Sequence, residues 1–190
     1  MIRKDCFQFG KIIPGLKLDG KKVNYRVLNE REVRAGAGIM FLLGSIGFSL
    51  AFFYGNYIFL KVVVVLFFVD FLIRVIWGTC PSLISMMARY MVAQQDPEWV
   101  GAVQKRFAWG IGLLMTSFMI VFLVILDTRG AHNLIICAIC LTVMWLEASF
   151  GLCVGCKMYY RLLGLGIIPE PKERPKCAGG SCSIKKKGID

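Results

Sequence analysis

The sequence predicts an all-α integral membrane protein with four transmembrane helices arranged as two hairpins. Of its 190 residues, 57% are hydrophobic and 18% are charged, whereas soluble domains are nearer half apolar and a quarter charged. The mean hydropathy of +0.64 also indicates a membrane protein. Four apolar stretches each come close to the roughly 20 residues that a helix needs to cross a bilayer.

The four apolar stretches cover residues 36–54, 57–77, 107–126 and 133–153. Only short connections separate the first stretch from the second and the third from the fourth. Helices joined by short connections usually pack as antiparallel neighbours. We therefore expect two helical hairpins, with the lipid bilayer as their surroundings.

Lysine and arginine predict the orientation of these helices. They are abundant before the first stretch, between the second and third, and after the fourth, whereas the two short connections contain only Arg129. Because basic loops stay in the cytoplasm, we expect both termini and the middle loop there. The net charge of +11 then reflects cytoplasmic loops, and we expect no nucleic-acid partner.

This orientation divides the chain into three parts. We expect residues 1–34 to form a basic cytoplasmic segment, residues 35–165 the four-helix membrane domain, and residues 166–190 a flexible, basic tail that contains cysteines. The first part lacks the apolar core of a cleavable signal peptide.

Local signals predict where the elements begin. Asn29 and Glu32 have the spacing of a capping box, which starts the first helix before its apolar stretch. The Asp-Pro-Glu sequence at residues 96–98 predicts the start of the third long helix. Residues 81–93 are apolar but too short to span, so we expect an interfacial helix. Residues 10–29 are expected to form short strands or turns.

The most notable motif is the C-x-x-C pair Cys153 and Cys156, at the inner end of the fourth stretch. Cys80, at the end of the second stretch, is expected at a similar depth. The cytoplasm keeps thiols reduced, so such a pair is more often redox-active or metal-binding than structural. On a continuous helix both sulfurs would share a face, and they would bind one soft metal ion or form a reversible disulfide.

Two further cysteine pairs have weaker interpretations. Cys177 and Cys182 lie among lysines in the tail, where they are either incidental or a mobile dithiol that exchanges with the embedded pair. Cys137 and Cys140 lie inside the fourth stretch, where cysteine commonly serves as a small packing residue.

Charged residues inside the predicted spans form another candidate site. Asp70 and Arg74 are four residues apart on one helix face, and Glu147 lies at a similar depth on the fourth stretch. Intramembrane charges are usually paired or functional, so we expect these three to meet, with Arg74 as the partner of Glu147. Arg106 is a further possible partner. The group is either a structural ion pair or, since one carboxylate lacks a base, a proton-handling site.

Five segments in order resemble a known family. They are LNEREVRAGAG (28–38), DFLIR (70–74), PSL (81–83), KRFAWGIG (105–112) and LEASFGLCVGCKMYY (146–160). Together they resemble the small bacterial membrane proteins of domain of unknown function 4395. The resemblance implies four helices, a bacterial cell membrane and no established activity. It directs interest to the following residues: Asp70, Arg74, Arg106, Glu147, Cys153 and Cys156. It also implies a loose association with thioredoxin-like and sulfurtransferase proteins.

Three functional hypotheses follow. The first is a membrane thiol protein that passes reducing equivalents or sulfur through Cys153 and Cys156, with Cys80 nearby. Any cofactor is unknown, and this chemistry needs none. The second is a binder or transporter of a soft metal ion (copper, zinc or mercury), with Cys153 and Cys156 as ligands. In this hypothesis the path runs along the fourth stretch from Cys137 and Cys140 to Cys153 and Cys156. The third is a structural partner of another membrane protein. The substrate, any enzymatic activity and the oligomeric state stay open.

Overall fold

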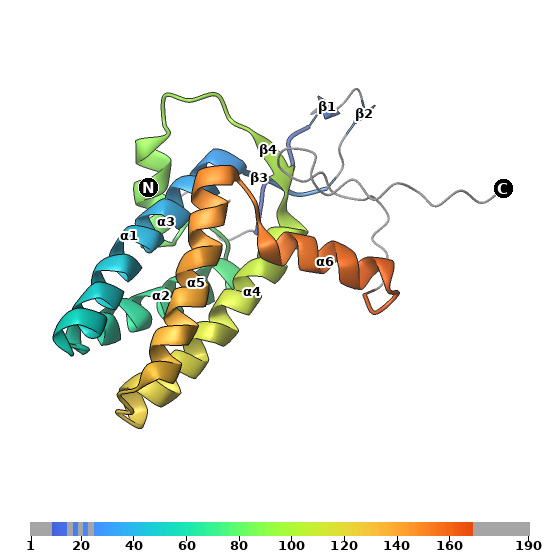
Figure 1. Ribbon diagram of the computed structural model, residues 1–190. Helices are drawn as coiled ribbons and strands as arrows, with labels where there is room; N and C mark the ends of the chain where they lie inside the picture. The colour runs from blue at the N-terminus through green and yellow to red at the C-terminus, as the bar shows by residue number, and fades with distance from the viewer. Residues whose placement is uncertain (1–8, 15–16, 19–20, 23–24, 169–190) are drawn as a thin grey trace.

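The computed structural model describes residues 9–14, 17–18, 21–22 and 25–168, which are mostly helical (Figure 1). The helices are α1 (Glu30–Tyr54), α2 (Ile58–Ile76), α3 (Leu83–Met91), α4 (Ala102–Met119), the π-helix η2 (Ile120–Ile125), α5 (Ala131–Phe150) and α6 (Val154–Gly164). The short strands pair as β1 (Lys17–Leu18) with β2 (Lys21–Lys22), and as β3 (Val27–Asn29) with β4 (Trp99–Gly101).

Four long helical segments form the body of the molecule. α1 packs against both α2 and α5, while α4 and η2 pack against α2. α1 turns into α2 at Gly55, whose left-handed backbone (φ 64°) favours glycine. Figure 1 shows α4 and α5 as the second pair, joined at the end of the bundle farthest from the β3–β4 strands. Two helical hairpins therefore lie side by side.

Within the described part of the chain, three helices are long and apolar enough to cross a membrane: Glu30–Tyr54, Ala102–Ile125 and Ala131–Phe150. α2 is not among them, because its 19 residues include Lys61, Asp70 and Arg74. The long helices also keep large apolar side chains on their outer surface, among them Leu42, Phe53, Val62, Ile125, Ile135 and Ile139. Lipid-facing helices present such a surface, so these features indicate a membrane protein.

The capping prediction for the first helix is confirmed. Asn29 is the N-cap of α1, and its side-chain oxygen accepts the N–H of Arg31 at 3.2 Å. The Asn29 amide also donates to the Glu32 carboxylate at 3.3 Å. α1 therefore begins before the apolar run, as the spacing of Asn29 and Glu32 predicts.

The prediction that the third long helix starts at residues 96–98 is wrong. The Glu98 carbonyl instead accepts the N–H of Glu30 at 2.7 Å, and the Glu98 N–H donates to the Asn29 side chain at 3.1 Å. β4 follows and pairs antiparallel with β3, with Val27 opposite Gly101. Because this strand ladder uses the backbone that the helix would need, α4 begins only at Ala102. The starts of α1 and α4 are thereby held together.

The short helix between the two hairpins is present, but it is shorter than residues 81–93. α3 begins after Ser82, whose hydroxyl accepts the N–H of Ser85 at 3.1 Å as an N-cap. α3 packs on α1, at the end of the bundle where α1 begins. Short strands also occur within residues 10–29, as expected.

The fourth long helix does not continue to Cys153, contrary to the sequence-based prediction. α5 ends at Phe150, and Gly151 has a left-handed backbone with φ 66°. The guanidinium of Arg34 on α1 donates to the carbonyls of Ala148 and Ser149, at 3.3 and 3.0 Å. A cation at the last carbonyls of a helix stabilises its C-terminus. Glycine and arginine together end α5 and allow α6 to begin as a separate helix.

Candidate functional site: a disulfide at a helix N-terminus

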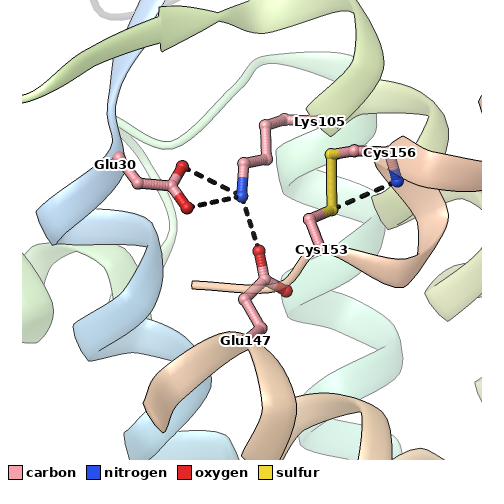
Figure 2. The surroundings of a disulfide bond; sticks show 5 residues. All are labelled: Glu30, Lys105, Glu147, Cys153 and Cys156. Atoms are coloured by element: carbon pink, nitrogen blue, oxygen red, sulfur yellow. Dashed lines mark hydrogen bonds and ion pairs between the residues drawn. A yellow bond between two sulfur atoms is a disulfide. The ribbon is translucent and has the colours of Figure 1, made fainter. Parts of the chain in front are cut away.

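Cys153 and Cys156 form a disulfide at the start of α6 (Figure 2). Their Cα atoms are 5.2 Å apart, within the range that disulfides require. Cys153 is the N-cap of α6, with extended backbone, and its sulfur accepts the N–H of Cys156 at 3.3 Å. The pair is therefore not on one face of a continuous membrane helix. It lies at the positive end of a separate helix of eleven residues.

Apolar and aromatic side chains pack around this disulfide. Cys153 is 9% exposed and Cys156 is 3% exposed. They form one cluster with Tyr159, Tyr160 and Leu163 of α6, against which Phe107 and Ala108 of α4 pack. A Cβ on Gly155 would lie 2.6 Å from the Ala108 Cβ, so this position needs glycine for α6 to approach α4. The glycine inside the C-V-G-C motif thus positions the pair against the membrane domain.

A buried ion cluster lies in the surroundings of the disulfide (Figure 2). The Lys105 ammonium group contacts Glu30 at 2.9 and 3.0 Å and Glu147 at 2.7 Å. Lys105 comes from α4, Glu30 from the first residue of α1, and Glu147 from the last turn of α5. We call these three residues the Lys105 cluster. Its two carboxylates share one ammonium group.

The Lys105 cluster corrects two predicted pairings. Glu147 was expected to pair with Arg74, but its hydrogen-bond partner is Lys105. Arg106 was a further possible partner of the intramembrane carboxylates. Instead, Arg106 donates to the Val75 carbonyl at 2.9 Å, and its guanidinium lies 5.0 Å from the Phe9 ring centre.

Sequence reasoning missed Lys105 and Glu30 because both were assigned to the polar cytoplasmic parts of the chain. One available signal was the placement of Lys105 directly before Arg106 in the KRFAWGIG segment. A second was the position of Glu30 immediately after the Asn29 cap.

A second buried network confirms the predicted pairing of Asp70 with Arg74. The Arg74 Nε lies 2.6 Å from one Asp70 oxygen, and the Ser82 hydroxyl donates to the other oxygen at 2.6 Å. The Arg74 guanidinium lies 5.6 Å from the ring centre of Trp109. A Cβ on Gly36 would come within 3.4 Å of the guanidinium, so a small residue there leaves room for it. We call Asp70, Arg74 and Ser82 the Arg74 cluster.

The other predicted thiols lie in different places. Cys137 and Cys140 are free thiols in α5 and line a cavity inside the bundle. Cys80 lies between α2 and α3 and is not a free thiol. Cys177 and Cys182 lie outside the described residues. Where the structure is described, no group of three or more His, Cys, Asp or Glu side chains is arranged to hold a metal. As a disulfide, Cys153 and Cys156 offer no thiolate to a soft metal.

Comparison with protein families gives one decisive match. The model described as "Domain of unknown function (DUF4395)" matches residues 28–163. The chain belongs to this family. The matched DUF4395 segment includes the Lys105 cluster, the Arg74 cluster and the Cys153–Cys156 pair, whereas Cys177 and Cys182 lie beyond it. No curated protein and no solved structure matches the chain.

Proposed function

We propose that this protein carries out thiol–disulfide exchange at the cytoplasmic face of a bacterial inner membrane. The observation that carries the proposal is the position of Cys153 as the N-cap of α6, bonded to Cys156 in its first turn. Backbone N–H groups and the helix dipole stabilise a thiolate at a helix N-terminus. A thiolate is the attacking form in exchange reactions.

The two sulfurs differ in ways that assign their roles. Cys153 is the more exposed, and its sulfur accepts the Cys156 N–H at 3.3 Å. Cys153 is therefore the attacking thiolate, and Cys156, which is 3% exposed, is the resolving thiol. This assignment follows from the greater exposure of Cys153 and from the N–H that its sulfur accepts.

In the reduced form, the Cys153 thiolate attacks one sulfur of a partner's disulfide. A mixed disulfide forms, and the other partner sulfur leaves as a thiolate. Cys156, having lost its proton to solvent, then attacks the Cys153 sulfur and releases the second partner thiolate. Two electrons pass to the partner, and the Cys153–Cys156 disulfide remains. A dithiol partner reverses both steps.

The proposed membrane placement has four spans, with α2 as the fourth. The burial of Asp70 and Arg74 as an ion pair supports it, since α2 then presents mainly apolar side chains outward. The exposed face of α3 (Leu83, Met86, Met87, Tyr90 and Met91) supports an interfacial position. Basic residues before α1 and after α6 support cytoplasmic termini.

The partner we propose is a thioredoxin-like dithiol protein or a sulfurtransferase. The chemistry of the Cys153–Cys156 pair supports this choice, since a dithiol protein exchanges with such a disulfide through a mixed-disulfide intermediate. Cys80 and the tail pair Cys177 and Cys182 are candidate internal exchange partners.

The test is a trapping experiment on the full chain in lipid nanodiscs. In a chain with Cys6, Cys80, Cys177 and Cys182 changed to Ala, reduced Cys156→Ser is mixed with a thioredoxin that keeps one active-site cysteine, activated as its mixed disulfide with thionitrobenzoate. The thionitrobenzoate leaves as the new disulfide forms, and the product is resolved on a non-reducing gel alongside Cys153→Ser. We expect Cys156→Ser to accumulate a mixed disulfide and Cys153→Ser to accumulate none. Cys137→Ser with Cys140→Ser is the matched control and should exchange like the natural chain.

Two outcomes would overturn the proposal. One is equal trapping by Cys153→Ser and Cys156→Ser, which would place the reactive thiol elsewhere. The other is a Cys153–Cys156 disulfide that resists reduction by thioredoxin at equilibrium, which would make the bond structural. A persulfide donor offers a further test, read by mass spectrometry. If Cys153 gains one sulfur atom from the donor, the function of this residue is sulfur transfer and not electron transfer.

A further inference from the structure

A cavity of about 60 Å³ lies inside the bundle, away from the Cys153–Cys156 pair. Its walls come from the middle parts of α1, α2, α4 and α5, at residues such as Gly44, Phe67, Gly112 and Leu141. Cys140 precedes Glu147 by seven residues, which is about 10 Å along a helix. The cavity is therefore deeper in the membrane domain than the Lys105 cluster.

Sulfur is the only donor element on the walls of this cavity. Met115 and Met119 reach it from α4, and Cys137, Cys140 and Met144 reach it from α5. The walls present no exposed nitrogen or oxygen. Thr116 lines the cavity, but its hydroxyl lies 2.9 and 3.0 Å from the carbonyls of Gly112 and Leu113, to which it is bonded.

The spacing of these side chains places each set on one face of its helix. Met115 and Met119 are four residues apart on α4, and Cys137, Cys140 and Met144 follow at intervals of three and four on α5. Residues three or four apart share a helix face. Two helices therefore line the same cavity with cysteine and methionine side chains, and Cys137 and Cys140 are free thiols.

We propose that this cavity is a binding site for Cu(I). Thiolate and thioether ligands without oxygen or nitrogen select soft ions, and thioethers favour Cu(I) over Zn(II). One thiol loses its proton to solvent as the Cu–S bond forms. A monovalent ion with one thiolate is then neutral overall, which avoids the cost of a net charge inside the membrane. This site is independent of the proposed exchange at Cys153.

Simple packing explains the cavity less well. Methionine is flexible and usually fills irregular gaps in a core. Here three methionines converge and still leave about 60 Å³ open. The volume exceeds what one ion needs, so the proposal rests on the sulfur-bearing side chains among the lining residues.

The test measures Cu(I) affinity with a chromophoric Cu(I) chelator as competitor, in the absence of oxygen, on the full chain in detergent. Two reciprocal variants are compared with the natural chain. In the first, only Cys137 and Cys140 are changed, each to Ala. In the second, all six other cysteines are changed to Ala. We expect the second variant to bind one Cu(I) per chain with the natural affinity. Changes to residues that support a metal site without binding the metal typically weaken affinity roughly 10–100-fold. We expect the variant without Cys137 and Cys140 to lose more affinity for Cu(I) than that.

A variant with Met115→Leu and Met119→Leu separates thioether binding from general packing, because leucine keeps the apolar volume. It should weaken Cu(I) binding without changing the melting temperature. Ile135→Ala with Ile139→Ala, on the exposed face of α5, is the control and should bind normally. Retention of Cu(I) by the first variant, its loss from the second, or a preference of the site for Zn(II) would overturn the proposal.

Discussion

At the scale of single residues, Lys105 is the most consequential side chain in the described structure. It is 2% exposed and holds Glu30, which is 0% exposed, together with Glu147. A buried ion pair contributes little net stability compared with apolar residues of the same size, but removing one partner leaves an uncompensated buried charge. Removal of the Lys105 ammonium group would leave both carboxylates of the Lys105 cluster without their cation.

Lys105→Met should therefore destabilise the protein by about 3–5 kcal/mol. Thermal unfolding in detergent measures the loss. Lys61→Met is the matched control, since its partner Asp127 is half exposed, and it should melt close to the natural chain. Adding Glu30→Gln and Glu147→Gln to Lys105→Met should recover most of the stability. If Lys105→Met melts like Lys61→Met, the cluster does not hold the helices together.

Glu147 should also affect the redox equilibrium of the disulfide beside it (Figure 2). The negative charge of Glu147 disfavours a thiolate at the Cys153–Cys156 pair. Glu147→Gln removes this charge, while Lys105 keeps its positive charge. The reduced form gains stability, so the reduction potential should rise, by about 30 mV for a tenfold change in the equilibrium constant. Equilibration with a dithiol buffer and a thiol-specific mass tag measures it. Asp127→Asn, at the far end of the bundle, should leave the potential unchanged.

At the scale of elements, the break between α5 and α6 determines what the C-V-G-C motif can do. On a continuous helix the two cysteines would lie within the backbone hydrogen-bond ladder. The break places Cys153 outside that ladder, where its sulfur accepts an N–H that has no helical carbonyl partner. Gly151 and the Arg34 cap on α5 are the two features that produce the break.

Gly151→Ala should destabilise the protein by about 1 kcal/mol, because alanine is strained at a φ of 66°. It should also shift the reduction potential, since the start of α6 would move. Gly110→Ala is the matched control, because Gly110 lies in the middle of α4 and a Cβ there would meet no atom within 4 Å. Alanine at such a position should instead stabilise by about 0.5–1 kcal/mol. Equal melting temperatures for both variants would contradict a structural role for the left-handed turn.

Sequence patterns predict the elements better than their junctions. Apolar length predicts both ends of α2 and α5 within three residues. It predicts where α1 and η2 end, but α1 and α4 begin six and five residues before their apolar stretches. The Asn29 cap predicts where α1 starts. Sequence patterns do not predict that α5 ends at Phe150. The apolar run continues past Gly151. The residue that caps the helix, Arg34, is 114 residues away from Ala148 in the sequence. The start of α4 is hidden for the same reason, since strand pairing with β3 decides it. Local signals cannot report distant contacts.

The candidate site shows the same limit. The Asp70–Arg74 pair follows from a spacing of four on one helix, and the structure confirms it. The partner of Glu147 depends on which of several cations three helices bring to one point. The depths of the two residues along their helices were compatible with Arg74 as the partner of Glu147. The packing of α1 against α5 instead brings Lys105 and Glu30 to Glu147.

At the scale of the whole molecule, the two clusters and the disulfide lie at one end of the bundle. α1, α4 and α6 begin there, and α2 and α5 end there, as Figure 1 shows. At the opposite end, Asp127 pairs with both Lys61 and Arg129. The ends of the bundle are therefore chemically distinct, which gives the proposed orientation a direct test.

Single cysteines at exposed positions should report that orientation. In a chain without its native cysteines, Asn56→Cys and Arg129→Cys should react with a membrane-impermeant maleimide on intact cells. Gln94→Cys should react only after the cells are permeabilised, because four spans place the α3–β4 loop in the cytoplasm. Labelling of Gln94→Cys from outside would mean that α2 does not cross the membrane. Labelling of all three only after permeabilisation would exclude the hairpins from spanning.

The antiparallel pairing of β3 with β4 has a consequence for how the chain is made. Val27 emerges from the ribosome long before its partner Gly101, and the whole α1–α2 hairpin lies between them. In the proposed four-span placement, the strand pair closes only once the α1–α2 hairpin has returned the chain to the side where it started. Closing the pair brings the first residues of α4 to those of α1 without any contribution from α5. Assembly of the Lys105 cluster must therefore wait for the last long helix to complete it.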